Sequence, residues 1–170
     1  MVLLGIGSNL KSNFGNRFMN IDIAISYLEQ YEIKLIKKSS YYESLSYPDP
    51  SKPKFINVVI EVSTSLPPED LASVLIYIEE KLERKRNKKN DPRTCDIDII
   101  DYDNETLDFK YKNLHLIIPH KELKSRNFVL IPLKEICPNW KHPKTGEIIN
   151  TLIQQLSEDD RKSILKTKES

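Results

Sequence analysis

Two aspartates two positions apart are the clearest candidates for chemistry in this chain. Asp96 and Asp98 alternate with isoleucine in the segment Cys95–Ile100, a period-two pattern typical of a β-strand with one polar and one buried face. Both carboxylates therefore point the same way, with Cα atoms ~6.6 Å apart. Because like charges on one strand face repel, the pair predicts a divalent cation between them. Mg²⁺ suits such a site, since it takes oxygen ligands and completes its shell with water and phosphate.

A basic segment directly precedes the aspartates. Its six cations within ten residues are Arg84, Lys85, Arg86, Lys88, Lys89 and Arg93. Cations beside a metal-binding pair are typical of a metal–nucleotide site, where Mg²⁺ bridges phosphate oxygens and Arg or Lys takes the others. Alone, the charge run would more often be a solvated loop, and the aspartates a solvated strand face. Their combination favours a nucleotide site.

Composition limits the other function classes. The 170 residues are 39% hydrophobic and 30% charged, which is typical of one soluble globular domain. A net charge of +1, from 26 basic and 25 acidic residues, argues against a dedicated nucleic-acid binder. Cys95 and Cys137 have no partner at metal-ligand spacing and are expected to be reduced thiols. No signal peptide or run of about 18 apolar residues is present, so we expect a cytoplasmic protein with no membrane or nucleic-acid partner.

The elements that must position the charged residues follow from hydrophobic periodicity. Strands are expected over 2–6, 33–42, 55–62 and 96–100, and helices from Ser12 or Asn13, from Pro67-Pro68 and over 148–156. We expect a single domain over 1–160 and a frayed C-terminal tail over 161–170. Gly5-Ile6-Gly7 has neither the third glycine of a dinucleotide fingerprint nor a following Gly-Lys-Ser/Thr. These glycines are therefore better explained by close packing at a strand end.

Residues 44–54 contain three prolines and predict a loop of the kind that covers or lines a binding site. Phe55 and Asn57 follow on one face of the next strand. They offer a flat ring for stacking and a paired donor and acceptor, which are the groups that recognise a flat heterocycle. Most such residues at strand ends are structural, so this pair gains weight only beside the nucleotide site.

A series of short motifs occurs in order along nearly the whole chain. They are Gly7-Ser8-Asn9, Phe55-Ile56-Asn57, Pro68-Glu69, Arg84 and Arg86, Pro92-Arg93-Thr94, Asp96-Ile97-Asp98, Pro119-His120 and Arg126-Asn127-Phe128. Together they resemble the 6-hydroxymethyl-7,8-dihydropterin pyrophosphokinases of folate biosynthesis. The resemblance implies an α+β fold, a ferredoxin-like α/β/α sandwich around a small, mostly antiparallel sheet. It also implies transfer of the β,γ-diphosphate of ATP to the hydroxymethyl group of the pterin, with release of AMP.

The resemblance also assigns roles to individual residues. Asp96 and Asp98 would bind two Mg²⁺ ions, with ATP as co-substrate. The implied catalytic residues are Arg84, Arg93, Asp98, His120 and Arg126. The implied pterin-binding residues are Ser44, Leu45, Tyr47, Phe55, Asn57 and Phe128. The implied ATP-binding residues are Glu79, Arg84, Arg86, Arg93, His120 and Arg126.

The chain departs from the family pattern at three places. Asn90-Asp91 stands where members commonly carry Trp-Gly, in a basic loop about one residue shorter than usual. Lys121 replaces a frequent tyrosine, and His115 replaces a frequent arginine and is left without a role.

Three alternatives remain open at this stage. A two-metal phosphohydrolase or nuclease would use the same aspartates but would normally add further ligands. An RNA-binding module of similar topology would need aromatic residues on its central strands. A family member that binds nucleotide without turnover is the third. Because no apolar helix face is left over after the core is assigned, the protein is expected to be a monomer.

Overall fold

The computed structural model describes residues 1–169, which form one large sheet, a separate hairpin and helices on both faces of the sheet. The strands are β1 Val2–Ser8, β2 Lys34–Lys38, β3 Tyr41–Ser44, β4 Phe55–Ser63, β5 Asp96–Tyr102, β6 Leu107–Tyr111, β7 Leu114–Ile118 and β8 Leu165–Thr167. The helices are α1 Arg17–Gln30, α2 Pro68–Lys81, α3 Asn127–Ile136, α4 Ile149–Gln155 and α5 Glu158–Lys162, with a short 3-10 helix, η1, at Leu123–Ser125. None of these helices is long and apolar enough to cross a bilayer.

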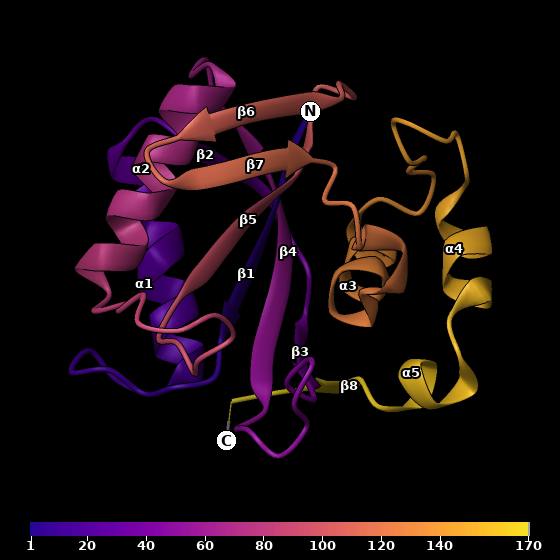
Figure 1. The fold of residues 1–170 in the computed structure, drawn as a ribbon, viewed down its shortest axis with the longest axis horizontal. Helices are drawn as coiled ribbons and strands as arrows, with labels where there is room; N and C mark the ends of the chain where they lie inside the picture. The colour runs from indigo at the N-terminus through magenta and orange to yellow at the C-terminus, as the bar shows by residue number, and fades with distance from the viewer. Residues whose placement is uncertain (170) are drawn as a thin grey trace.

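The large sheet has the strand order β5-β1-β4-β3-β8, and β2 pairs with the far half of β4. Every pairing among the described strands is antiparallel. Helices α1 and α2 lie on one face of the sheet, and α3 and α4 lie on the other (Figure 1). This arrangement confirms the predicted α+β sandwich around a small antiparallel sheet.

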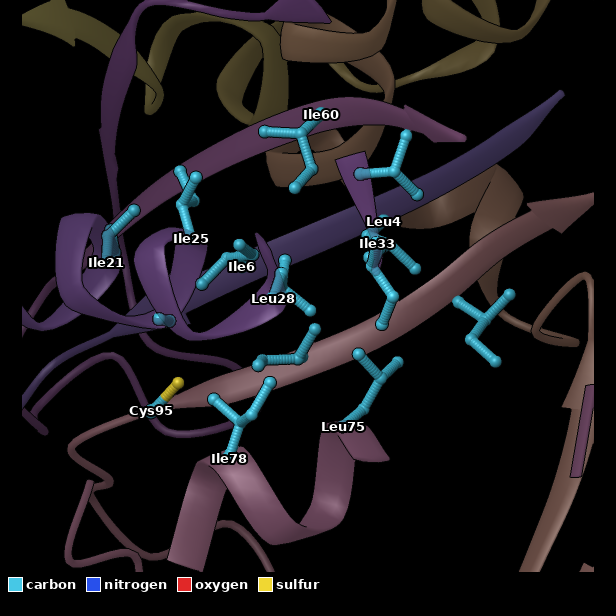
Figure 2. Close-up of a cluster of buried hydrophobic side chains, with 14 of the residues drawn as sticks. Leu4, Ile6, Ile21, Ile25, Leu28, Ile33, Ile60, Leu75, Ile78 and Cys95 are labelled. Carbon is cyan, nitrogen blue, oxygen red and sulfur yellow. The ribbon is translucent and has the colours of Figure 1, made fainter. Parts of the chain in front are cut away.

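Alternation along the strands divides the buried side chains between two cores. Even-numbered residues of β1, such as Leu4 and Ile6, face α1 and α2, whereas Leu3 faces α3 and α4. Figure 2 shows the first core, in which the sheet residues meet Ile21, Ile25 and Leu28 of α1 and Leu75 and Ile78 of α2. Each buried Leu or Ile side chain contributes roughly 1.5–3 kcal/mol. The two cores therefore fix both helical layers to the sheet.

Helix α2 delivers the basic segment to the start of β5. Pro68 occupies its first turn, where proline is tolerated, and Glu69 and Asp70 complement the positive end of its dipole. The helix ends at Lys81, and residues 84–93 then return the chain to Asp96 at the first position of β5. The prediction that this helix leads into the charged site is confirmed.

Two predicted boundaries differ from the structure. The expected strand over 33–42 is two strands, because the backbone and hydroxyl of Ser39 bind the backbone of Val59 and interrupt the ladder. Helix α1 begins at Arg17, capped by the Asn16 side chain, and not at Ser12 or Asn13. Ser12 instead bridges to Gly15 and donates its hydroxyl to Asn20 at 2.6 Å.

The C-terminal segment also differs from its prediction. Within the expected frayed tail, Leu165–Thr167 forms β8 and pairs with β3 at the sheet edge. Open backbone groups on an edge strand are available to pair in this way, and short-range sequence patterns do not reveal them. Ser170, also in the predicted tail, lies outside the described residues.

Candidate active site

The α3 face of the sheet contains a floor made by two glycines. Gly7 pairs with Asn57 of β4 on one side and with Asp96 of β5 on the other. Gly5 pairs with Val59 and Asp98 in the same way. Since strands are ~4.8 Å apart, β4 and β5 lie roughly 10 Å from each other across this glycine floor. The absence of side chains at Gly5 and Gly7 keeps the surface low between Asn57 and the two aspartates.

Gly7 allows a close approach to the β4 side of the floor. A Cβ atom at Gly7 would lie 3.2 Å from Asn57 Oδ1 and 3.3 Å from Phe55 Cδ1. The predicted close packing of this glycine is therefore confirmed. It also means that Phe55 and Asn57 share the α3 face with the aspartates.

Asn57 is held with one end free. The residue is 6% exposed, and its Nδ2 donates to Ser44 Oγ at 2.8 Å and to the Tyr42 carbonyl at 3.4 Å. No donor among residues 1–169 reaches its Oδ1. This Oδ1 is fixed beside Gly7 without an internal donor, so it is suited to accept a hydrogen bond from a ligand N–H.

Asp96 and Asp98 share one strand face, as predicted, but differ in surroundings. Both oxygens of Asp96 are held by guanidinium groups, Oδ1 by Arg84 at 2.7 Å and Oδ2 by Arg93 at 3.1 Å. The Asp98 side chain is 53% exposed, and its contact with Arg126 is longer, at 3.5 Å. Asp98 is therefore the more open of the two carboxylates.

The two pKa values move in opposite directions for this reason. Partial removal from water raises the pKa of Asp98 to about 6, and the charge of Asp96 adds to the rise, while Arg126 opposes it. Removal from water acts on Asp96 as well, but the Arg84 and Arg93 guanidiniums outweigh it and hold the pKa of Asp96 below its usual value. Asp96 is thus fixed as an anion by two guanidiniums, whereas Asp98 has the single, longer contact with Arg126.

Glu79 lies beneath the basic segment, 2% exposed, on α2. It accepts hydrogen bonds from Arg84 Nη1 at 2.8 Å and from the Ile97 backbone at 2.7 Å, and it forms an ion pair with Arg86. Burial raises the pKa of Glu79, and Asp96 adds to this, while the two guanidiniums oppose it. These contacts orient Arg84 and Arg86 from below.

His120 and Arg126 lie together next to Asp98. His120 Nδ1 accepts from the Glu122 backbone N–H at 3.1 Å. Its Nε2 lies 3.2 Å from Arg126 Nη2, which belongs to a guanidinium and can only donate. Partial burial lowers the pKa of His120, and the Arg126 charge lowers it further. The Arg126 guanidinium, beside the His120 ring, is suited to bind an anionic acceptor such as a phosphate oxygen.

Two aromatic rings border the site, each covered by an arginine. The Arg93 guanidinium carbon lies 5.9 Å from the centre of the Phe55 ring, and that of Arg126 lies 5.6 Å from the centre of the Phe128 ring. Phe128 is half-buried near the start of α3. Both predicted stacking residues are therefore next to predicted phosphate-binding residues.

The predicted residues of the 44–54 loop are divided between the interior and the surface. Ser44 is buried against Asn57, whereas Leu45 and Tyr47 are 42% and 70% exposed. Lys52 connects this loop to the basic segment, since its Nζ donates to the Asn90 carbonyl at 2.8 Å. Asp91 Oδ1 lies 3.9 Å from the same Nζ.

Asn9 joins three segments of the site, although no individual role was predicted for it. It is 3% exposed, and its Oδ1 accepts from the Arg93 backbone N–H at 2.7 Å. Its own N–H donates to the Arg93 carbonyl at 3.0 Å, and its Nδ2 donates to the Pro53 carbonyl at 3.0 Å. Its occurrence in the Gly7-Ser8-Asn9 motif was the one signal that could have identified it.

Hollows lie on both sides of the basic segment. One of about 310 Å³ lies between this segment and Leu114 of β7, and its lining includes Arg84, Arg86 and Arg93. Another of about 450 Å³ lies on the opposite side, against Leu10 and Lys11. The first is lined mainly by cations, which suits a polyphosphate, with Leu114 as the apolar residue of its lining.

His115 and Lys121 lie outside this cluster. His115 is on the exposed face of the β6–β7 hairpin, where Nε2 is 2.5 Å from Asp108 Oδ1. Lys121 is exposed, and no hydrogen bond or ion pair within residues 1–169 involves it. The structure thus brings together the two aspartates, the arginines, His120 and Glu79, with Phe55 and Asn57 across the floor.

The donor set fits a hard divalent cation. Asp96 and Asp98 supply carboxylate oxygens from one strand face, the ligand type that Mg²⁺ prefers. Within the described part of the chain no three His, Cys, Asp or Glu side chains gather as a metal site. Two protein carboxylates are nevertheless the usual provision for Mg²⁺ that completes its shell with substrate phosphates and water.

Comparison with known proteins gives one consistent family. A family model described as 7,8-dihydro-6-hydroxymethylpterin-pyrophosphokinase (HPPK) matches residues 3–138. The 2-amino-4-hydroxy-6-hydroxymethyldihydropteridine pyrophosphokinase of Synechocystis sp. is 36% identical over 91% of this chain and 75% of that protein. The protein of the same name from Aquifex aeolicus is 37% identical, over 84% of this chain and 83% of its own length.

Some similar proteins are much longer. The folic acid synthesis protein fol1 of Pneumocystis carinii is 37% identical over 92% of this chain, which corresponds to 21% of that protein. Among solved structures, an HPPK-DHPS of Plasmodium falciparum has a TM-score of 0.76 at 16% identity, covering 97% of this chain and 46% of that one. This likeness shows a shared fold, and the present chain spans less than half of that longer protein.

Proposed function

The chain belongs to the 7,8-dihydro-6-hydroxymethylpterin-pyrophosphokinase family, and from this premise we propose how its site binds the two substrates and transfers the diphosphate. The reaction is pyrophosphate transfer from ATP to hydroxymethyldihydropterin in folate biosynthesis. The observation that carries the proposal is the glycine floor, which sets Phe55 and Asn57 on one side and Asp96 and Asp98 on the other.

The pterin occupies the β4 side of the floor in this proposal. Asn57 Oδ1 accepts from an N–H on the pterin edge, while Ser44 fixes the other end of the amide. Phe55 and Phe128 provide ring faces for stacking once the two arginines move away from them. Leu45 and Tyr47, exposed on the adjacent loop, complete the proposed pterin-binding set.

The triphosphate occupies the cationic side. Arg84, Arg93, His120 and Arg126 donate to its oxygens, and Glu79 with Arg86 sets the position of Arg84. Phosphoryl-type transfer needs positioning and neutralisation of spreading charge more than covalent participation by the protein. The planar guanidinium groups of the arginines present several N–H donors in a fixed geometry, which suits that task.

We further propose that Asp96 and Asp98 hold two Mg²⁺ ions. When bound, these ions would neutralise charge on the triphosphate and polarise the phosphorus that is attacked. For Asp96 to bind a cation, Arg84 and Arg93 must release its oxygens. The phosphates offer these arginines new anionic partners, so nucleotide and metal binding favour each other.

The transfer itself is a substitution at the β-phosphorus. A bond forms from the hydroxymethyl oxygen to that phosphorus, and the bond from the phosphorus to the oxygen bridging to the α-phosphate breaks. AMP leaves with the bridging oxygen, and the hydroxyl proton passes to water. Arg126 and the adjacent His120 are placed to hold a phosphate oxygen during this change.

Three finer features belong to the same proposal. The chain acts as a monomer and as a single domain, to which β8 at the sheet edge also belongs. The shorter basic segment, with Asn90-Asp91 in place of Trp-Gly, closes over ATP through the Lys52 contacts to Asn90 and Asp91 in place of an aromatic contact.

The direct test is an incubation with ATP, Mg²⁺ and 6-hydroxymethyl-7,8-dihydropterin, followed by separation of the nucleotides and pterins. We expect AMP and the pterin diphosphate in equal amounts. Formation of ADP or inorganic phosphate would indicate another phosphoryl transfer or a hydrolase. ATP binding without product would indicate an inactive family member.

A further inference from the structure

The C-terminal residues contact the two elements that carry the proposed pterin-binding residues, the start of α3 and strand β3. Asn127, the first residue of α3, donates its Nδ2 to the Asp160 carbonyl at 2.7 Å and to Ser163 Oγ at 3.2 Å. Its two chain neighbours are Arg126 and Phe128. Asp160 and Ser163 both lie beyond residue 138, where the match to the family model ends.

The Asn127 contacts matter because α3 begins without a conventional cap. Arg126 occupies the N-cap position and makes no side-chain capping hydrogen bond. The first turn is instead held by its own backbone, through the amides of Val129 and Leu130, which both donate to the Arg126 carbonyl at 3.0 Å. The direction in which Arg126 and Phe128 leave the helix start therefore depends on what Asn127 binds.

The same C-terminal segment reaches the other half of the site through β8. This strand pairs with β3, with Tyr42 opposite Lys166 and Glu43 opposite Leu165. β3 ends at Ser44, whose hydroxyl holds the Asn57 amide. Lys166 also lies 3.5 Å from Glu135 of α3, so β8 touches both the sheet edge and the helix.

We propose that residues 157–169, here called the C-terminal brace, form a positioning element of the active site. Through Asn127 the brace fixes Arg126 and Phe128, and through β8 it fixes Ser44 and hence Asn57. The inference rests on the proposed pterin site, and it adds a segment outside the matched family region. The brace touches neither substrate; it sets the spacing between the two sides that hold the pterin.

Two variants test the two contacts of the brace separately, the one with Asn127 and the one between β8 and β3. Asn127→Ala removes both hydrogen bonds to the brace and keeps a good helix former at the start of α3. A chain ended after Ile164 removes β8 and leaves α5 and the Asn127 contacts in place. Glu158→Gln is the matched control, because it removes only an exposed pair with Lys162 on α5.

We expect Asn127→Ala to raise the KM for the pterin about tenfold and to lower kcat, since small misplacements of positioning groups are costly in rate. The truncated chain should raise the pterin KM with less effect on kcat, because the β8 strand that it lacks acts on Asn57 through β3 and not on Arg126. The Kd for ATP measured without pterin should stay within twofold in both. Glu158→Gln should match wild type throughout.

A structural role alone would lower Tm and leave the pterin KM and kcat of the folded protein within twofold of wild type, which would overturn the proposal. Amide hydrogen exchange provides a readout independent of turnover. Asn127→Ala should speed exchange at Val129 and Leu130 and leave the core amides unchanged. If wild type forms no AMP, the proposed function fails and the kinetic test no longer applies. The brace is then tested by amide exchange alone, and unaltered exchange at Val129 and Leu130 in Asn127→Ala would contradict it.

Discussion

At the scale of single residues, Asp96 and Asp98 look alike in the sequence but differ in their exposure and in the cations that contact them. Asp96 has a guanidinium on each oxygen, whereas Asp98 is half exposed with one guanidinium at 3.5 Å. The charge of Asp98 is therefore the less well compensated of the two.

Replacement of Asp98 therefore should separate activity from stability. Asp98→Asn should reduce turnover by at least ~10³-fold, because a metal-binding charge is lost. In EDTA at pH 8 the same variant should be more stable than wild type by about 1 kcal/mol, or a Tm about 2–4 °C higher, after allowance for solvent screening. Thermal unfolding and AMP formation measure the two effects.

The stability gained by replacing Asp98 with Asn should depend on pH. The folded Asp98 pKa of about 6 lies above the ordinary 3.8, so its protonated form favours folding below 3.8 and this contribution is lost as the pH rises through about 6. The advantage of the Asn variant should accordingly be absent near pH 3.5 and complete above about pH 7. An advantage of the same size at both pH values would contradict this account.

Gly7 is predicted to be essential for pterin binding. In Gly7→Ala the new methyl group would press on Asn57 Oδ1 and Phe55, at 3.2 and 3.3 Å. We expect the pterin KM to rise about tenfold, equivalent to ~1.4 kcal/mol, with the Kd for ATP unchanged. Isothermal titration with each substrate separately checks this, and a variant that loses both affinities equally would point to a general disturbance of the sheet.

At the scale of elements, the site depends on segments that meet only after folding. Residue 9 follows β1, Pro53 lies in the loop before β4, and Arg93 lies in the segment before β5, yet Asn9 binds the other two. Each of these segments is short and irregular. Their relative placement therefore depends on such hydrogen bonds more than on hydrophobic packing.

Replacement of Asn9 tests this connection. Asn9→Ala leaves the part-buried backbone groups of Arg93 and Pro53 without their partner, at a cost below the roughly 1–3 kcal/mol of a fully buried group, and should lower kcat/KM about 10–100-fold. Asn9→Asp keeps the acceptor for the Arg93 N–H but places an oxygen against the Pro53 carbonyl. It should therefore retain more ATP affinity than pterin affinity, as measured by binding of each substrate alone. Equal losses for both substrates would contradict this division.

Element prediction was accurate where one periodicity dominated. The strands at Val2–Ser8 and Phe55–Ser63 and the helix at Pro68–Lys81 agree with their hydrophobic patterns and their flanking residues. It was wrong where a side chain replaced a backbone partner, as at Ser39, or where pairing was distant, as in β8. Such contacts have no signal within a short window of sequence.

At the scale of the whole molecule, the candidate site is built from segments of the N-terminal and middle parts of the chain, around the edge strand β5. Cations and anions at this edge neutralise one another before any substrate arrives. Binding of Mg²⁺ and ATP should replace these internal pairs by bonds to the ligand and stabilise the fold.

Thermal unfolding with and without ligands measures this linkage. At 100 times its Kd, ATP with Mg²⁺ should add about 2.7 kcal/mol, or about 5–11 °C in Tm for a domain of this size. Removal of Mg²⁺ by EDTA should abolish most of the shift, and in Asp98→Asn the shift should be small with or without the metal. An equally large shift for ATP in EDTA would argue against binding of the metal at Asp96 and Asp98.

The sequence by itself determined the fold class, the family, the shared direction of Asp96 and Asp98, and the set of cations near them, because alternation and charge are local properties of the chain. The tertiary structure decided which arginine holds which carboxylate oxygen, that Asn9 joins three loops, and that β8 and Asn127 connect the C-terminal brace to the pterin side. These depend on the register of antiparallel strands and on hydrogen bonds between residues far apart in the sequence, such as Asn9 and Arg93, which are 84 positions apart. Contacts of that kind are selected by the packing of the whole sheet, so no local pattern specifies them.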